Sequence, residues 1–196
     1  MIACAAVGFG AIVGVTGWVV TDVLEQNNDF CNACHLRENV PLHQEIRSDF
    51  DDRPALTLAA LHAAQPVAAR PGDPVARCID CHGGVSWLGR ARVKALAAQD
   101  AFFWVIGDFE EPTHMASPLW DEDCRQCHER FDSAEADLGN TPFHALDVHN
   151  SALGIDCVEC HSVHQAGGNP DVYFLQTAHV RTQCGRCHVE FEEDLQ

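Results

Sequence analysis

Five copies of the pattern Cys-x-x-Cys-His constrain this chain more than any other feature, and they take up ten of its eleven cysteines. The units are Cys31/Cys34/His35, Cys78/Cys81/His82, Cys124/Cys127/His128, Cys157/Cys160/His161 and Cys184/Cys187/His188. This pattern is the attachment signature of c-type haem. Its two thiols form thioethers with the haem vinyl groups, and the adjacent histidine supplies the proximal nitrogen to iron. We therefore predict five covalently bound haem c groups.

Other cysteine chemistries do not fit the spacing. A structural zinc site takes four ligands, usually from two nearby Cys or Cys/His pairs. Here the later units begin 43, 42, 29 and 23 positions after the histidine of the preceding unit, and five pairs do not divide into Cys₄ sites. A thioredoxin-like motif would occur once, beside a βαβ pattern. A disulfide scaffold does not explain a histidine after every second cysteine.

The remaining histidines are candidates for the second axial ligand of each iron. Seven are left after the proximal set, namely His43, His62, His114, His144, His149, His164 and His179. They suffice for bis-histidine ligation of all five haems, and this ligation favours low potentials because a methionine ligand raises them. We rank His43 and His144 below the other five, and His62 first because it lies in a helical run over residues 55–64.

The same spacing predicts an all-α fold with little regular secondary structure. The chain offers about 39 residues per unit, too few for a conventional apolar core, so the covalent cofactors act as the core of a small scaffold. We predict a long helix over residues 85–106 and shorter ones over 120–131 and 174–191. Residues 52–54, 71–74 and 167–170 are expected to form loops.

The amino-terminal segment differs from the rest of the chain. Residues 2–20 carry no charge over 19 positions, or about 28 Å as a helix, close to a hydrocarbon core of about 30 Å. A signal peptide is the alternative, but it would have a basic region and a shorter apolar core. We therefore predict a transmembrane anchor over residues 1–24 and a haem domain over 25–196. The predicted location is the inner membrane, with a single span and the haem domain on the periplasmic side.

The charge balance bears on partners. The chain has 29 acidic and 12 basic residues, a formal net charge of -17. A basic footprint for nucleic acid is therefore absent. An acidic surface favours docking to a basic electron acceptor, with an association that weakens as salt is added.

With these features, the chain resembles the NapC/NirT family of membrane-anchored quinol dehydrogenases. The resemblance spans roughly residues 1–165, where an apolar segment precedes a series of haem motifs. It is carried by residues 30–35, 78–84, 119–124, 142–144 and 157–164. Family members usually have four haems, whereas this chain adds a fifth motif. Many have a methionine ligand two residues after the first motif, where this chain has Arg37, so His43, solvent or a carboxylate is the candidate ligand of haem one.

The resemblance implies electron transfer from a membrane quinol to a periplasmic or membrane-complex redox protein. It also implies a quinol site near the first haem, formed by a lysine and an aspartate from the helix after the second motif. The matching residues are Lys94 and Asp100. Independently of the family, a carboxylate near an accepting haem can take up a quinol proton within hydrogen-bond reach, and a cation can stabilise the quinolate.

Three function classes follow from these observations. The first is an anchored electron-transfer protein with quinol dehydrogenase activity of its own. The second is a haem wire, either in a larger respiratory or photosynthetic complex or in an extracellular conduit, with no quinol site in this chain. The third is a terminal reductase, which needs an iron with an open sixth position and is disfavoured by the surplus of histidines.

Overall fold

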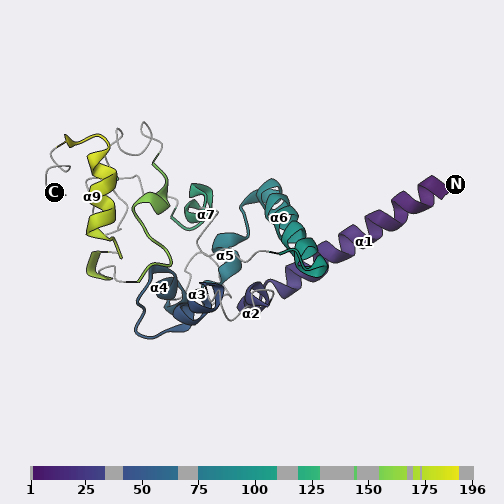
Figure 1. Cartoon of the computed structure of the whole chain (residues 1–196), viewed down its shortest axis with the longest axis horizontal. Coiled ribbons are helices and arrows are strands. Elements are labelled where there is room, and N and C mark those ends of the chain that lie inside the picture. The colour runs from purple at the N-terminus through teal and green to yellow at the C-terminus, as the bar shows by residue number, and fades with distance from the viewer. Residues whose placement is uncertain are drawn as a thin grey trace. The chain divides into compact units, whose positions relative to one another are not determined.

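The computed structural model describes residues 2–33, 42–65, 75–109, 119–128, 144, 155–166, 170–172 and 174–189, with side chains from Gly8 onwards in the first helix. Its elements, shown in Figure 1, are α1 (Ile2–Leu24), α2 (Asn28–Asn32), α3 (Leu42–Asp51), α4 (Leu58–Ala64), α5 (Cys78–His82), α6 (Ser86–Ile106), α7 (Asp121–Arg125), η1 (Cys157–Glu159), η2 (Pro170–Val172) and α9 (Thr177–Gly185). Helices and turns account for these ranges, and none of the described residues forms a strand. The predicted all-α class is confirmed.

Local signals explain where the helices begin and end. The predicted helix over 85–106 is confirmed as α6, which ends at Gly107 in the left-handed conformation (φ 79°) that glycine adopts readily at a helix end. The predicted helical run over 55–64 starts later, because Thr57 caps α4 by accepting a hydrogen bond from the Ala60 amide at 3.1 Å. Two glycines follow the second motif, and a side chain at Gly84 (φ 75°) would come within 2.6 Å of the Gly89 backbone. Only glycine therefore fits this turn.

The chain folds into two compact units. The first comprises Met1–Arg47 and Arg77–His114, and the second comprises Ser48–Ala76 and Met115–Gln196. Motifs one and two fall in the first unit, and motifs three, four and five fall in the second. The haem region predicted as one domain over 25–196 is thus shared between two units.

Few apolar side chains are buried in the described part of the chain. They are Phe50, Ala59, Ala60, Ala63, Ala76 and Phe174. Within the second unit, Phe50 packs with Ala59 and Ala63, and Val163 covers them. Most of this set is alanine, whose burial contributes little hydrophobic free energy. The expectation that covalent cofactors fill the space between the helices stays a prediction.

The predicted inner-membrane location requires correction. Within the ranges described above, no helix is sufficiently long and apolar to traverse a bilayer. This finding contradicts the single-pass location and leaves the transmembrane assignment of residues 1–24 without support. The last turn of α1 carries Asp22, which forms ion pairs with Arg90 and Lys94 of α6.

Candidate functional site

The haem-attachment turns are short helices with capped beginnings. In motif two, the carboxylate of Asp80 accepts a hydrogen bond from the Arg77 amide at 2.9 Å. In motif four, Glu159 accepts one from the Asp156 amide at 2.9 Å. Both carboxylates stand directly before the second cysteine of their motif. A side-chain acceptor here satisfies a backbone donor that a helix start otherwise leaves unpaired, and so fixes the turn that carries both cysteines.

In the first unit, the turns of motifs one and two lie against each other. The Cys78 amide donates to Oδ1 of Asn28 at 3.0 Å, and α2 packs on α5. The Cys31 and Cys78 thiols are hydrogen-bonded to each other, which raises the pKa of Cys31 and lowers that of Cys78. This unit can therefore hold two haems at neighbouring attachment points.

The second unit repeats the arrangement with motifs three and four. The Cys157 amide donates to Oδ1 of Asp121 at 2.8 Å, and α7 packs on η1. A hydrogen bond between the thiols of Cys124 and Cys157 raises the pKa of Cys157. Asn28 and Asp121 each stand three residues before the first cysteine of their own motif. The two units thus use the same tie between successive motifs.

Motif five lies beside motif four in the same unit. α9 packs on η1, and burial raises the pKa of the Cys160 thiol, with the charge of Cys184 adding to the effect. The second cysteine and the histidine of motif five, Cys187 and His188, are both exposed.

The second cysteines of motifs two and three are Cys81 and Cys127. Cys81 is half-buried within α5, and Cys127 is exposed after α7, where its amide donates to the Cys124 carbonyl at 3.2 Å. Both side chains are thiols in the structure, whereas haem attachment would convert each to a thioether. Their haem-binding role therefore stays a prediction. Disulfides do not compete with it, because none forms at the nine motif cysteines within the described ranges, namely Cys31, Cys78, Cys81, Cys124, Cys127, Cys157, Cys160, Cys184 and Cys187.

Two proximal histidines of the second unit face a predicted distal histidine. The ring centroids of His62 and His128 lie 6.1 Å apart, with 82° between the ring planes. Those of His144 and His161 lie 6.0 Å apart, with 15° between the planes. Two imidazoles on opposite sides of one metal, each with a metal–nitrogen bond of about 2.0 Å, place their centroids about 6 Å apart. Both pairs therefore have the spacing that a six-coordinate haem iron requires.

The His62 ring is held in place by its own helix. Its Nδ1–H donates to the Leu58 carbonyl at 2.8 Å, one turn earlier in α4. A hydrogen bond at one ring nitrogen fixes the tautomer and leaves Nε2 as the ligand atom. Thr57 is 1% exposed at the start of this helix, so the cap and the ligand belong to one rigid element.

The pKa shifts of these histidines favour the form that binds iron. Burial lowers the pKa of His128, and the charge of the neighbouring His62 lowers it further. Burial also lowers the pKa of His144. In the first unit, burial and then the charge of the nearby His43 lower the pKa of His82. A neutral imidazole is the metal-binding form, and each of these shifts favours it.

His179 adds a buried nitrogen in α9. Its Nε2 is buried and has no hydrogen-bond partner among the described residues. A buried polar atom without a partner costs free energy, and an iron ligand at Nε2 would remove that cost. This atom and the two ring pairs show that the residues present fit haem.

The structure places most of the predicted ligands. His164 is half-buried shortly after η1, where it interacts with another residue. The cysteines and histidines of motifs two to five and Cys31 lie within the described ranges. Cys34, His35, His114 and His149 lie outside them, as do Arg37 and Met115.

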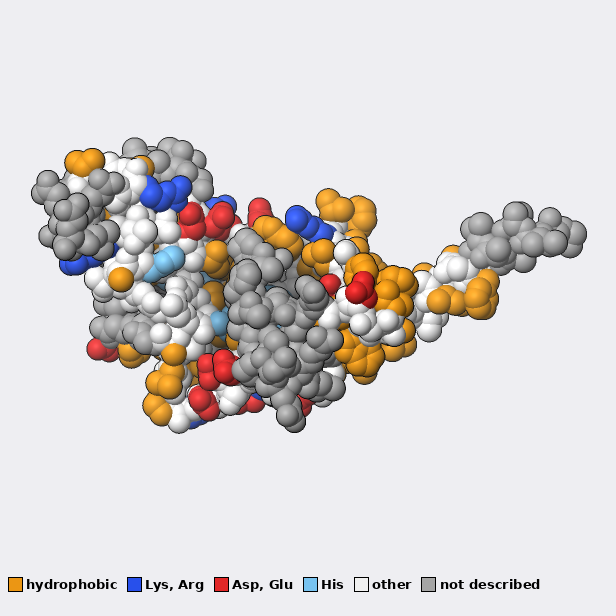
Figure 2. Space-filling view, viewed as in Figure 1, with side chains coloured by type: hydrophobic (Ala, Val, Ile, Leu, Met, Phe, Trp, Pro, Cys, Tyr) orange, Lys and Arg blue, Asp and Glu red, His pale blue; other side chains and the backbone are white. Residues whose placement is uncertain are grey.

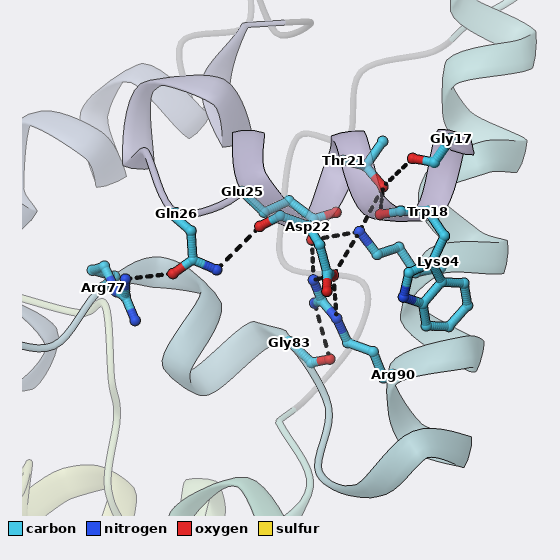
Figure 3. A network of polar contacts seen from close by, with 10 residues as sticks. All are labelled: Gly17, Trp18, Thr21, Asp22, Glu25, Gln26, Arg77, Gly83, Arg90 and Lys94. Carbon is cyan, nitrogen blue, oxygen red and sulfur yellow. Dashed lines mark hydrogen bonds and ion pairs between the residues drawn. The ribbon is translucent and has the colours of Figure 1, made fainter. Parts of the chain in front are cut away.

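Lys94 lies in a cluster of charges between α1 and α6, drawn in Figure 3. Its Nζ bonds to the Glu25 carboxylate at 2.8 Å and to the Thr21 hydroxyl at 2.6 Å. It also lies 5.8 Å from the centroid of the Trp18 ring. The side chains of Lys94 and Glu25 are only 10% and 11% exposed, so their charges are held in a largely dry environment.

Arg90 completes this cluster. It pairs with Asp22 and Glu25 and donates to the Gly83 carbonyl at 3.3 Å. Burial acts against the charge of Arg90, yet its bond to Asp22 and the charge of Glu25 raise its pKa. Asp22 is also 3.1 Å from Lys94. Asp100, by contrast, is exposed, and no described contact joins it to Lys94.

Sequence reasoning did not assign Asp22 and Glu25 to this site. The available signal was the position of two carboxylates, spaced three apart, where the apolar run ends. Such a spacing places both on one helix face, where they can meet cations from another helix.

The comparisons with known proteins agree with the haem motifs. The chain is 26% identical over 182 residues to a protein of Allochromatium vinosum named "Putative tetraheme cytochrome-c type", covering 83% of this chain and 86% of that protein. No family model matches the chain. No solved structure matches it either.

The motifs and this relative together support a multihaem c-type cytochrome. The name of the relative specifies four haems, whereas the sequence of this chain holds five motifs.

Proposed function

We propose that this protein is a five-haem electron-transfer cytochrome, related to the NapC/NirT family over its first 165 residues or so and extended by a fifth haem. The spacing of the histidine pairs in the second unit, 6.1 and 6.0 Å between ring centroids, carries the proposal. Haem c supplies one-electron exchange between Fe(III) and Fe(II). The cysteine turns of the chain anchor each haem, and its histidines set the ligation and hence the potential.

The proposal includes three axial assignments. His62 would complete the haem of His128, and His144 would complete the haem of His161. His43 would complete the haem of His82, supported by its effect on the His82 pKa. Bis-histidine ligation of these haems favours low potentials and disfavours the terminal reductase, which needs an open coordination position.

Haem counting tests the proposal. We expect the intact mass of the purified holoprotein to exceed that of the chain by five haems, and the pyridine haemochrome assay to give five per chain. A count of four would reject the fifth haem. A predominantly high-spin EPR spectrum of the oxidised protein would reject bis-histidine ligation.

A second candidate concerns the electron donor. We propose that a quinol is oxidised at the cluster formed by Lys94, Glu25 and Asp22. The low exposure of Lys94 and Glu25 supports this proposal, as does their location in the unit with motifs one and two. Oxidation of a quinol to the quinone releases two protons and two electrons. Glu25 would accept one proton and Asp22 the other within hydrogen-bond reach, and Lys94 would stabilise the quinolate. The two electrons would pass one at a time to the haems that motifs one and two would hold.

Reduction of the haems by a short-chain menaquinol analogue, followed at the α-band, tests this donor. We expect rapid reduction of the wild type and at least a tenfold slower rate for Lys94→Ala. Gln99→Ala, an exposed change on the same helix, should match the wild type. Failure of the quinol to reduce the wild type, with normal reduction by dithionite, would reject the quinol site and favour a haem wire. Equal rates for Lys94→Ala and the wild type would remove Lys94 from the site.

A further inference from the structure

The turn of motif four is in contact with both other motifs of its unit. η1 packs against α7, which carries Cys124, and against α9, which carries Cys184. Among the described residues, the main packing contacts of α7 and of α9 are made with η1 rather than with each other. Motif four is therefore the shared neighbour of motifs three and five.

One carboxylate fixes the turn of motif four and holds motif five to it. Oε2 of Glu159 accepts the Asp156 amide at 2.9 Å, and Oε1 pairs with the Arg186 guanidinium at 2.8 Å. Glu159 and Arg186 occupy equivalent positions, each directly before the second cysteine of its motif. The ion pair thus connects the two attachment turns at matching points.

The cysteines and their exposure extend this picture. Cys184, the first cysteine of motif five, is an electrostatic neighbour of Cys160, the second cysteine of motif four. Cys160 and His161 are half-buried, whereas Cys187 and His188 are exposed. Val189, which follows them, is 71% exposed. Motif five therefore continues the row of motifs towards solvent.

Building on the proposed five-haem function, we infer that the second unit carries a three-haem relay in the order three, four, five, in which the Glu159–Arg186 pair seats haem five beside haem four. With haems bound, each transfer along it would be a one-electron exchange in which one iron would go from Fe(II) to Fe(III) and its neighbour from Fe(III) to Fe(II). No bond forms or breaks, and a redox protein supplies or removes the electron.

Removal of haem five tests the order. The double variant Cys184→Ala/Cys187→Ala should lose the mass of one haem. An EPR-monitored redox titration of this holoprotein should then show a shifted midpoint for haem four, identified as the signal that His144→Ala abolishes. The signal of haem three, identified through His62→Ala, should shift less, because haem four lies between it and haem five. The comparison uses only the signals of haems in the second unit.

The outcomes separate this inference from the proposed function. A wild type with only four haems rejects the five-haem function itself. A wild type with five haems, together with an unchanged haem four or a larger shift of haem three, overturns the order alone. If the double variant loses all its haems, His188→Met serves instead, because it keeps both thioethers and raises the potential of haem five. The midpoint potential of haem four should then shift as well. An unchanged midpoint potential of haem four would again overturn the order.

Arg186→Glu tests the ion pair as a positioning contact. It replaces attraction to Glu159 with repulsion, so we expect all five haems to be retained and the coupling between haems four and five to weaken. Adding Glu159→Arg to Arg186→Glu restores opposite charges and should recover the coupling. An unchanged titration of haem four in Arg186→Glu would remove the ion pair from the inference.

Discussion

At the scale of single residues, the two histidine pairs of the second unit differ in one measurable way. The rings of His62 and His128 are nearly perpendicular, at 82°, and those of His144 and His161 are nearly parallel, at 15°. Perpendicular axial rings leave the iron d orbitals close in energy, which gives a highly anisotropic low-spin EPR signal. Parallel rings separate these orbitals and give a rhombic signal. The oxidised protein should therefore show both types.

Replacement of one distal ring should remove one type of signal. His62→Ala takes the sixth ligand from haem three, so we expect the highly anisotropic signal to be lost and a high-spin signal to replace it. The rhombic signal of haem four should remain. Gln65→Ala, an exposed change at the end of the same helix, is the control and should leave both signals intact. An unchanged spectrum of His62→Ala would refute its assignment.

Sequence reasoning names the candidate ligands, but it does not give the pairing of proximal and distal histidines. The five motifs name their proximal histidines directly, because the ligand is adjacent to the cysteine that anchors the haem. A distal histidine is brought to its iron by tertiary folding alone. For this reason His144, ranked low, lies 6.0 Å from His161. His62, ranked first because of its helix, lies 6.1 Å from the proximal His128 between ring centroids.

At the scale of elements, the two units tie successive attachment turns together with one hydrogen bond each. Asn28 serves the first unit and Asp121 the second, and each accepts the amide of the next motif's first cysteine. Such a tie fixes the relative position of two short helices that bury few apolar side chains. Loss of this hydrogen bond in one unit should therefore affect the two haems attached to the turns of that unit.

Asp121→Ala should destabilise the second unit. The carboxylate makes a bond of 2.8 Å to the Cys157 amide, and a bond of this kind contributes about 1.5–3 kcal/mol when one partner is charged. Thermal unfolding of the holoprotein should show this loss, and the EPR signals of haems three and four should broaden. Asp121→Asn keeps an acceptor, as Asn28 does in the first unit, and should lie close to the wild type. Equal destabilisation by both variants would contradict the role of the hydrogen bond.

The contact between α1 and α6 should weaken in acid. The hydrogen bond from Arg90 is the largest cause that lowers the pKa of Asp22 below its ordinary value of 3.8. A lowered pKa means that this stabilisation is complete above pH 3.8 and is lost as the pH falls through the lower value in the folded state. Because the Asp22 side chain is 45% exposed, the contribution is below about 1 kcal/mol.

Asp22→Asn measures this contribution. The variant has no carboxylate to protonate, so its melting temperature should depend less on pH than that of the wild type as the pH falls below 3.8. Circular dichroism at matched ionic strength follows the transition. A parallel pH dependence of the two proteins would show that Asp22 contributes nothing to folding. Asp100→Asn, an exposed carboxylate on α6, is the matched control and should follow the wild type.

At the scale of the whole molecule, the sequence predicts the type of secondary structure better than the arrangement of the helices in space. The helix over 85–106 and the all-α class follow from local patterns, because an apolar face and a terminal glycine are local signals. The division into two units does not follow, since α2 meets α5 through Asn28 and Cys78, which lie far apart in the chain. The ion pairs that the end of α1 makes with Arg90 and Lys94 of α6 likewise depend on tertiary folding and have no local signal in the sequence.

In the first unit, exposed apolar side chains lie near charged ones on the surface. Trp87 is 80% exposed and Val105 is 74% exposed on α6, and Figure 2 shows hydrophobic side chains gathered on this part of the molecule. Scattered exposed apolar residues are common on protein surfaces, so the net charge is the firmer guide to encounter with a partner.

The net charge of -17 makes the whole molecule an electrostatic attractor for cations and basic proteins. Opposite charges steer encounter and raise association rates by about 10- to 1,000-fold at low salt. The screening length falls from about 30 Å at 0.01 M to about 10 Å at 0.1 M ionic strength. Stopped-flow electron exchange with a small basic cytochrome should therefore slow by on the order of 10-fold over this range. An acidic redox protein should show the opposite trend, because screening relieves its repulsion. A rate to the basic partner that does not change with salt would mean that the acidic surface takes no part in docking.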